Sequence, residues 1–505
     1  MKESILGIDI GTSSIKCSLF DVDGFELLKT SSDYQNIYKD HGIVEIDSDV
    51  IWNAVIKAIK DLVRLNAGKY KIISIGICAI MIMPVLMDNK NNVIRPIIHW
   101  YDSRPAQQYY DIKQKGLDKL IAKFSGSALT GESTINTLSW IKTFEPDSYN
   151  KISKFIMLKD YVRFKLTGVV MSDFGDASGT QMLDTREWKW CDEIIDALGF
   201  KKRIFPELLK PFDIGGSISK EAEKLTGLLA GTPVAIGSGD GITTIFGLGI
   251  YREGQIGITV GSAGVIATPS KTYLEDDKHR GYVFCHPMCD RWLTLMATAS
   301  SGSVLKWYFE TMIRDKEITY SDLDSEASKS PPGSNGIIFF PYLLGSRNPH
   351  SNPGASGSFL GLRHKHKSSD ITRALLEGIS FELLDILLAE EEILGKGNIQ
   401  ASELKLSGGI TNSIFWPQLL ADILRKDIVI TKVKELGTLG SSIIASVAAK
   451  VYSNLENAIK KMVKNKNVIK HNKEFGSLYQ SRFEVFKDIY RALEPEFDKL
   501  LQRGF

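Results

Sequence analysis

The first residues that could do chemistry stand within the first 16 positions of the chain. An acidic residue, a turn of glycine and small hydroxyl residues, and a lysine follow one another there: Asp9, Gly11, Thr12, Ser13 and Lys16. Such a turn lets backbone N–H groups approach an anion, while the hydroxyls add donors and the lysine adds positive charge. The carboxylate can hold Mg²⁺, usually through water, because Mg²⁺ keeps much of its hydration. The alternative interpretation is an ordinary hairpin turn beside a chance acidic residue.

A second turn of the same kind stands in the other half of the chain. Gly261 and Ser262 open a run of very small residues between two apolar runs, 255–260 and 265–268, each of which predicts a strand. Glycine-rich turns are common, so this one alone says little. It repeats the strand, turn and strand of 5–20, however, which indicates two related lobes. Two such turns could clamp a polyphosphate between the lobes.

A third candidate is Asp240, which follows an apolar run at 233–237 and is flanked by glycines. A carboxylate at the end of a buried strand is accessible to a ligand and can act as a general base toward a hydroxyl group. The alternative is an Asp turn, in which the side chain bonds to nearby backbone.

The fourth candidate joins a predicted strand to a predicted helix. Gly408 and Gly409 end the strand, and Asn412 precedes a helix that we expect to begin near Ser413. This geometry lets a flat base or a ribose lie against the backbone. The sequence is neither G-x-G-x-x-G nor a Walker A motif, so an ordinary tight turn is the alternative.

These turns need a mixed α/β scaffold to position them. Runs at 5–11, 15–20 and 25–29 predict a β-meander. Periodicity then predicts strands and helices in alternation: strands at 72–77 and 233–237, helices at 51–63, 370–394 and 441–452, and a mostly helical pattern over 111–161. The segment 174–184 predicts irregular structure or a short edge hairpin, and we place a lobe boundary near 240–250.

The composition is that of a folded protein. Hydrophobic residues make up 43% and charged residues 24% of the 505 residues, and the net charge of +2 argues against a surface built to bind nucleic acid. Five cysteines, an odd number, form no disulfide framework and favour a reducing cytoplasm. Cys285, His286 and Cys289 look like half of a metal knuckle, but no second pair follows at zinc-like spacing.

No segment predicts insertion into a membrane. The longest apolar stretch, 72–87, contains serine, glycine and proline and is shorter than the ~20 residues that a spanning helix needs. The first residues meet Asp9 before any apolar run of the kind found in signal peptides, so we expect none.

Together these segments resemble the FGGY family of carbohydrate kinases. The runs 357–362 and 370–377 resemble the C-terminal signature of the family, and 341–349 resembles its G-E-R-x-P stretch, with Ser346 where Glu is usual. Further matches are distributed along the chain: Trp100, Asp102 and Arg104 fit W-x-D-x-R, and 159–161, 166–168 and 173–178 fit K-D-Y, L-T-G and D-x-x-x-A-S. The runs 284–286 and 301–303, with Trp307, are most similar to the xylulokinase-type branch.

The resemblance implies an α/β fold of the actin, Hsp70 and sugar-kinase superfamily, with two ribonuclease-H-like lobes and an interlobe cleft. Residues 1–245 would form the N-terminal lobe, which binds the sugar and carries the first phosphate loop. Residues 246–505 would form the C-terminal, nucleotide-binding lobe. ATP·Mg²⁺ would donate its γ-phosphoryl group to a hydroxyl of a small sugar, and lobe closure would exclude water.

The resemblance also implies a role for each matching residue. Asp240 would be the catalytic base and contact the substrate, and Asp9 would lie near Mg²⁺. The nucleotide would be bound by two phosphate loops and by residues near the base: Gly11, Thr12, Ser13 and Lys16; Gly261 and Ser262; and Gly302, Gly408, Gly409 and Asn412. The sugar would lie near Met81, Trp100, Asp102 and Arg104.

One departure from the branch bears on the substrate. Ile82 follows Met81 at a position where the xylulokinase-type branch usually has histidine. An apolar side chain cannot bond to a sugar hydroxyl, and leaving that hydroxyl unpaired costs about 1–3 kcal/mol. The resemblance to the branch implies a kinase for a pentulose such as xylulose. The departure at Ile82 bears against that sugar, so a kinase for gluconate, a polyol or another ketose is the alternative.

The alternative from another class is a nucleotide-binding protein of the superfamily without sugar kinase activity, either chaperone-like or degenerate. We expect ATP and Mg²⁺ as cofactors, a small sugar as partner, no nucleic acid or membrane partner, and a cytoplasmic location. The sequence does not fix the oligomeric state and is compatible with a homodimer.

Overall fold

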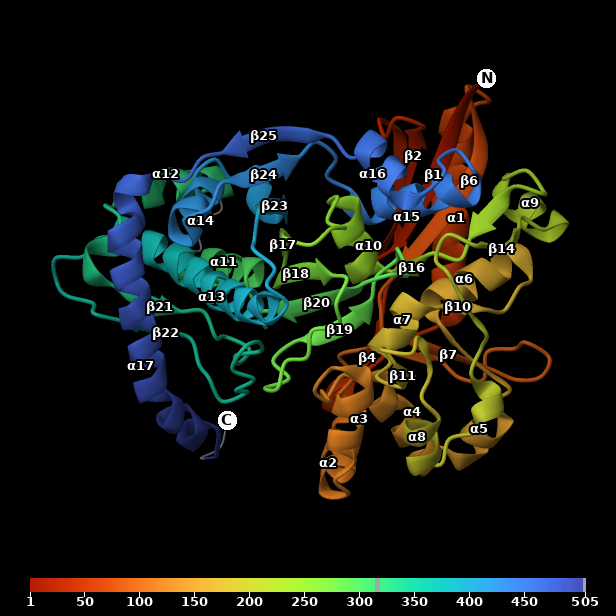
Figure 1. The fold of residues 1–505 in the computed structure, drawn as a ribbon, viewed down its shortest axis with the longest axis horizontal. Helices are drawn as coiled ribbons and strands as arrows, with labels where there is room; N and C mark the ends of the chain where they lie inside the picture. The colour runs from red at the N-terminus through yellow and green to blue at the C-terminus, as the bar shows by residue number, and fades with distance from the viewer. Residues whose placement is uncertain (314–317, 503–505) are drawn as a thin grey trace. The chain divides into compact units, whose positions relative to one another are not determined.

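The computed structural model describes residues 1–313 and 318–502, and the chain forms two compact units (Figure 1). The first unit comprises 1–251, 282–293 and 435–464. The second comprises 252–281, 294–434 and 465–505, of which 314–317 and 503–505 lie outside the described residues. The units are therefore discontinuous, whereas the division at 245 expected from the sequence is contiguous. That division stays a prediction about the two lobes.

The central sheet of the first unit runs in the order β14-β15-β6-β1-β2-β3, with β16 also beside β6. Its strands are β1 (Lys2–Ile10), β2 (Ser14–Asp21), β3 (Glu26–Asp33), β6 (Tyr70–Ala79), β14 (Ile214–Ser217), β15 (Pro233–Ala235) and β16 (Ser238–Gly239). β1 pairs antiparallel with β2 and parallel with β6, and β16 is also parallel to β6. The predicted meander at the start of the chain is thus confirmed.

The first unit also contains helices and short strands that are not part of this sheet. The helices of the first unit are α1 (Ser48–Asn66), α2 (Ala106–Gln114), α3 (Leu117–Ser125), α4 (Thr134–Phe144), α5 (Pro146–Lys151), α6 (Leu158–Thr167), α7 (Phe174–Gly179), α8 (Asp192–Ala197), α9 (Lys220–Thr226), α10 (Asp240–Gly247), α15 (Leu436–Ala448) and α16 (Leu455–Met462). The short strands are β4 (Ile37–Lys39), β5 (Ile43–Ile46), β7 (Pro84–Met87), β8 (Ile97–Ile98), β9 (Lys154–Met157), β10 (Ser172–Asp173), β11 (Leu183–Asp184), β12 (Lys189–Trp190), β13 (Leu208–Leu209) and β19 (Tyr282–Cys285).

The second unit repeats the hairpin-plus-parallel-strand arrangement. β17 (Gln255–Val260) pairs antiparallel with β18 (Gly264–Ser270) and parallel with β23 (Glu403–Gly408). The remaining elements are β20 (Trp292–Ala297), β21 (Ile338–Phe340), β22 (Ser358–Leu360), β24 (Ile428–Thr431), β25 (Asn465–Ile469), α11 (Gly302–Tyr308), α12 (Tyr320–Ser328), α13 (Ser368–Lys396), α14 (Trp416–Leu424) and α17 (Gly476–Gln502). The repeat predicted from the two small-residue turns is therefore present in the fold.

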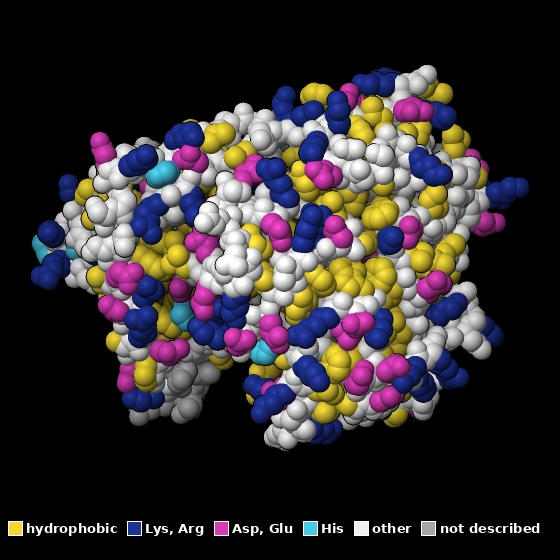
Figure 2. Space-filling view, in the orientation of Figure 1, with side chains coloured by type: hydrophobic (Ala, Val, Ile, Leu, Met, Phe, Trp, Pro, Cys, Tyr) yellow, Lys and Arg dark blue, Asp and Glu magenta, His cyan; other side chains and the backbone are white. Residues whose placement is uncertain are grey.

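Two local predictions differ in part from the structure. The segment 174–184 begins with a helical turn, α7, because Asp173 accepts hydrogen bonds from the backbone N–H groups of Gly175 and Asp176 and so caps it. It ends in β11, which pairs antiparallel with β12 as a short hairpin, one of the two structures expected for the segment. The helix expected near Ser413 begins later, at Trp416, because a 3₁₀ turn over Gly409–Asn412 comes first. No helix among the described residues is both long and apolar enough to cross a membrane. Figure 2 shows basic and acidic side chains interspersed, in keeping with the small net charge.

Helix α15 lies directly against the central strands of the first unit, although it comes from the far end of the sequence (Figure 1). A Cβ atom on Gly76 of β6 would lie 1.9 Å from the carbonyl oxygen of Ser441. A Cβ atom on Gly7 of β1 would lie 2.1 Å from the carbonyl oxygen of Thr438. Only glycine permits this approach, because the opposing atoms are backbone and cannot move aside as a side chain could.

We expect Gly76→Ala to lower the free energy of unfolding by about 1–3 kcal/mol, because the new methyl group must push α15 away from the sheet. Gly395→Ala in α13 is the matched control, since nothing lies within 4 Å of its added Cβ. That control should leave stability unchanged or raise it by up to about 1 kcal/mol. Thermal unfolding by circular dichroism measures both. Equal melting temperatures would contradict the packing described here.

Candidate functional site

The carboxyl ends of three adjacent strands bring the two candidate carboxylates to one edge of the first sheet. Asp9 of β1 is paired with Cys78 of β6, and Cys78 is paired on its other side with Ser238 of β16. Asp240 follows β16 directly and is the first residue of α10. The sequence predicted both carboxylates, and the sheet register explains why they lie near each other.

Asp9 is held by groups from two distant parts of the chain. The thiol of Cys78 donates to its Oδ1 at 3.5 Å, and a Cβ on Gly437 of α15 would lie 2.5 Å from its Oδ2. Burial raises the pKa of Asp9, and the nearby charge of Glu435 adds to this, while Cys78 and Lys16 oppose it. An added cation near Asp9 would therefore relieve an unfavourable charge.

Lys16 is paired with Glu435, and Nζ lies 2.8 Å from Oε2 although the two residues are 419 positions apart. The turn beside them, Gly11–Ser13, exposes Thr12 and Ser13. Among the residues that the structure describes, the backbone N–H groups of Thr12 and Ser13 have no acceptor. These donors, with Lys16, can bind an anion such as a phosphate.

Glu435 and Gly437 were missed from the sequence. The signal that could have found them is the cluster of small residues in Gly437–Ser442, which permits a helix to lie against backbone. Nothing in that signal, however, says which strands the helix contacts.

Asp240 has the electrostatics of a general base. Burial first, and then repulsion from Asp9, raise its pKa to about 7, although the N–H of Gly241 donates to its Oδ1 at 2.7 Å. A carboxyl group with a pKa near the operating pH can accept a proton and release it again. The same shift means that ionised Asp240 destabilises the fold.

A buried ion-pair network holds the strand that precedes Asp240. Ser238 donates to Oδ2 of Asp173 at 2.7 Å, and Nζ of Lys159 lies 3.0 Å from Oδ1 of the same carboxylate. Nζ of Lys159 also lies 2.5 Å from Oδ1 of Asp160. All four side chains are buried. The K-D-Y and D-x-x-x-A-S segments of the sequence therefore contact each other here, next to the strand β16 that leads into Asp240.

Met81 lies beside Asp240. A Cβ on Gly239 would lie 2.4 Å from Cγ of Met81, and one on Gly179 of α7 would lie 2.8 Å from its Cε. The next residue, Ile82, has φ of 58°, a left-handed conformation that β-branched residues rarely adopt. Strained backbone of this kind persists where the surrounding structure demands it.

The charges of Asp102 and Arg104 are paired mainly with each other. Nη2 of Arg104 lies 2.8 Å from Asp102 and 2.9 Å from Glu45, and its guanidinium lies over the ring of Trp140 at 4.8 Å. Although burial opposes the charge, bonds from Arg104 and from the N–H of Val44 hold the pKa of Asp102 below its usual range. Trp100 is half-buried beside them.

The candidate residues of the second unit also come together. Val260 at the end of β17 is paired with Gly408, so Gly261 and Ser262 lie beside the glycine turn after β23. A Cβ on Gly302 would lie 2.4 Å from the carbonyl oxygen of Gly261. Gly409 begins the 3₁₀ turn, and Asn412 ends it and accepts a bond from Lys434 at 2.6 Å. The turn and the strand ends thus form one glycine-lined surface.

Mg²⁺ fits the donors of the first unit. Among the described residues, no group of three or more His, Cys, Asp or Glu side chains could hold a metal ion by itself. Mg²⁺ needs no such group, because it keeps several waters and is commonly bound by one or two carboxylates plus substrate phosphates. Asp9, beside the free N–H groups of the turn, would hold it.

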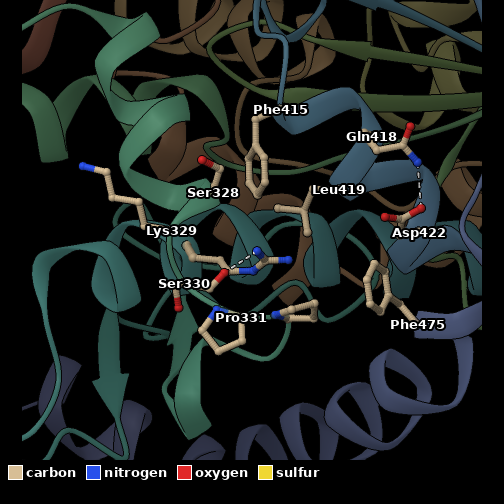
Figure 3. Close-up of a pocket in the computed structure, with 11 residues that line it drawn as sticks. Ser328, Lys329, Ser330, Pro331, Phe415, Gln418, Leu419, Asp422 and Phe475 are labelled. Atoms are coloured by element: carbon tan, nitrogen blue, oxygen red, sulfur yellow. Dashed lines mark hydrogen bonds between the residues drawn. The ribbon is translucent and has the colours of Figure 1, made fainter.

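A separate cavity of about 450 Å³ lies in the second unit, beside α14 (Figure 3). Its lining includes Phe415, Leu419, Asp422 and Phe475, with Arg373 packed over the ring of Phe415 at 5.2 Å. None of the sequence-predicted site residues is part of this lining.

We expect Asp240→Asn to raise the melting temperature at pH 8, because the variant removes a carboxylate whose folded pKa, about 7, lies above its unfolded value of about 3.8. The full shift, from 3.8 to about 7, sets an upper bound of about 4 kcal/mol on this gain. It should shrink as the pH falls from 8 to 5, where folded Asp240 is itself protonated. Thermal scans across this pH range measure it, and a gain independent of pH would contradict the raised pKa.

Comparison with known proteins agrees with this geometry. Residues 4–247 match the model of the N-terminal domain of the FGGY family of carbohydrate kinases, and 258–449 match that of its C-terminal domain. The chain is 28% identical over 487 residues to a xylulose kinase of Bacillus subtilis, covering 96% of each, and 27% identical over 515 residues to a gluconokinase of the same organism, covering 100% and 99%. A solved xylulose kinase from Lactobacillus acidophilus superposes with a TM-score of 0.92 at 27% identity, covering 99% of this chain and 100% of that one. The chain belongs to the FGGY family of carbohydrate kinases.

Proposed function

We propose that this kinase transfers the γ-phosphoryl group of ATP to a neutral pentulose, with xylulose as the leading candidate, and that Asp240 is the catalytic base. The observation that carries the proposal is the raised pKa of Asp240, about 7, beside Asp9 at the carboxyl ends of β1, β6 and β16. A carboxylate in this state can take the proton of a sugar hydroxyl as the oxygen attacks phosphorus.

The chain's own groups account for the rest of the transfer. The free N–H groups of Thr12 and Ser13, with Lys16, bind phosphate oxygens, and the turn at Gly261 and Ser262 offers donors of the same kind. Asp9 holds Mg²⁺, which supplies neutralisation of phosphate charge when bound. Phosphoryl transfer needs positioning and charge neutralisation more than covalent chemistry.

The charges near the predicted sugar segment favour a neutral substrate. Arg104 is paired with Asp102 and Glu45, and Arg95 with Glu45 and Glu145. A substrate carboxylate would have to displace one of these partners, and truncated ion pairs at buried positions are unfavourable.

The third basic side chain of this segment, His99, carries no charge that could bind a carboxylate. Burial lowers the pKa of His99 to about 4, so this side chain is neutral at pH 7. A sugar without a carboxylate needs no such partner. The similarity to gluconokinases keeps gluconate as the second candidate, because 27% identity extends over the whole chain.

Several further properties belong to the same proposal. The small net charge and the absence of a disulfide framework support a cytoplasmic enzyme. Its glycine-lined turn in the second unit, with Gly302, Gly408, Gly409 and Asn412, supports nucleotide binding by that unit. A homodimer is compatible with the sequence, and size-exclusion chromatography with light scattering tests it.

We expect Asp240→Asn to lower turnover by roughly 10²–10⁴-fold, because the amide cannot accept the hydroxyl proton. Affinity for MgADP should stay nearly unchanged. Asp192→Asn is the matched control, since Asp192 is also the first residue of a helix, α8, but is exposed. A coupled assay of ADP release with D-xylulose, D-ribulose, L-xylulose, erythritol and gluconate measures both variants. Retention of more than about a tenth of turnover by folded Asp240→Asn would rule out the base.

We expect Ile82→His to change the choice of sugar by about 10- to 200-fold, because it adds a donor to an apolar part of the site. The variant should fold at least as well as the parent, since histidine tolerates the left-handed backbone better than isoleucine. The same panel, extended with deoxyketoses, measures the ratio of kcat/KM values. If D-xylulose is preferred equally by both proteins, residue 82 does not set specificity.

A further inference from the structure

The carbonyl groups of the first phosphate turn are all bound by one neighbouring segment, 34–36. The hydroxyl of Tyr34 donates to the carbonyl of Gly11, and the backbone N–H of Tyr34 donates to that of Ser13 at 3.0 Å. Nδ2 of Asn36 lies 3.5 Å from the carbonyl oxygen of Thr12. The side chains of residues 34 and 36 thus both reach the turn from this segment. Every carbonyl of the turn therefore has a donor.

The N–H groups of the same turn differ from its carbonyl groups in their hydrogen bonding. The N–H of Gly11 closes the turn by donating to Ser14 at 2.9 Å. Those of Thr12 and Ser13 have no acceptor within 1–313 and 318–502. The turn thus keeps its positive dipole ends free while its negative ends are occupied.

The second unit shows the same pattern, built differently. The carbonyl of Ser262 accepts from the N–H of Ser301 at 2.7 Å and from that of Ser303 at 3.1 Å. The carbonyl of Gly261 accepts from the N–H of Gly302 at 2.9 Å. A Cβ on Gly302 would stand 2.4 Å from that same carbonyl oxygen. Backbone groups at the start of α11 here take the place of the donors that Tyr34 and Asn36 supply in the first unit.

We propose that Tyr34 is a positioning residue of the first phosphate turn, that it holds the carbonyl of Gly11 away from the bound nucleotide, and that Gly302 does the same for Gly261 in the second unit. This assignment rests on the proposed function, because it gives these turns the task of binding phosphate. It goes beyond that function in giving Tyr34, which the proposed function does not use, a role in orienting the turn, and in giving Gly302 such a role in addition to its place near the nucleotide.

The physical reason is the sign of the backbone dipole. A peptide unit that rotates exchanges its N–H for its carbonyl, and a carbonyl oxygen turned toward phosphate repels it. The bond from Tyr34 fixes the peptide after Gly11 in the orientation that suits an anion. Tyr34 is buried, and the phenyl ring of a phenylalanine fills the space of the tyrosine ring, so Tyr34→Phe deletes the bond with little change in packing.

We expect Tyr34→Phe to weaken MgADP binding by about three- to tenfold, the loss expected for one net hydrogen bond. KM for MgATP should rise by a similar factor, whereas KM for the sugar should stay unchanged. Isothermal calorimetry with MgADP and steady-state kinetics measure these values.

The matched control is Tyr452→Phe. The hydroxyl of Tyr452 donates at 2.5 Å to the carbonyl of Val22, in the other hairpin turn of the same sheet. This variant loses the same kind of bond, a phenol on a turn carbonyl, outside the site. It should lower the melting temperature about as much as Tyr34→Phe while leaving MgADP affinity at the parent value.

Gly302→Ala tests the second turn independently. The new methyl group must displace the carbonyl of Gly261, so MgADP affinity should fall while Gly395→Ala leaves it unchanged. Unchanged MgADP affinity in folded Tyr34→Phe, or an equal loss in Tyr452→Phe, would overturn the assignment of Tyr34. Because calorimetry needs no turnover, a parent protein that binds MgADP but phosphorylates no sugar would refute the proposed function and leave this inference standing.

Discussion

The first unit depends on how closely helix α15 approaches the sheet. Gly7 and Gly76 let its backbone lie on β1 and β6, and on another side Gly440 lets it lie on α10, where an added Cβ would stand 2.1 Å from the carbonyl oxygen of Thr243. The helix therefore contacts the strand that carries Asp9 and also the helix that begins with Asp240. The position of α15 therefore helps to determine where the carboxylates of Asp9 and Asp240 lie. Glu435, just before the helix, pairs with Lys16.

This placement has an electrostatic consequence. Burial raises the pKa of both Asp9 and Asp240, and the charge of Asp9 raises that of Asp240 further, so ionising both carboxyl groups is unfavourable. The fold tolerates the pair because fully buried contacts behind it, such as Lys159 with Asp173, hold the strands in place. Destabilised charge at one edge of a rigid sheet is a common arrangement where a protein must bind a cation or move a proton.

The sequence predicted those parts of the site that are local in the chain. A turn such as Gly11–Ser13 carries its own signal, because the residue types that permit close backbone approach are adjacent. Glu435 and Tyr34 carry no such signal, since their roles follow from packing over long separations. For Arg104 the sequence motif suggested a larger role in binding the sugar than the structure supports. A motif marked its position, but only the structure shows that Glu45 and Asp102 take up its charge.

The return of 435–464 to the first unit also affects how the protein is made. A ribosome releases the strands of the first sheet early, yet the helix that covers β1 and β6 is translated only after most of the second unit. Until then the glycine faces of these strands stay uncovered, and exposed apolar strands in an unfinished domain promote aggregation. The first unit is therefore completed only once α15 has been made. A nascent chain that stops before residue 435 has all the strands of the first sheet, but neither the helix that covers them nor a partner for Lys16.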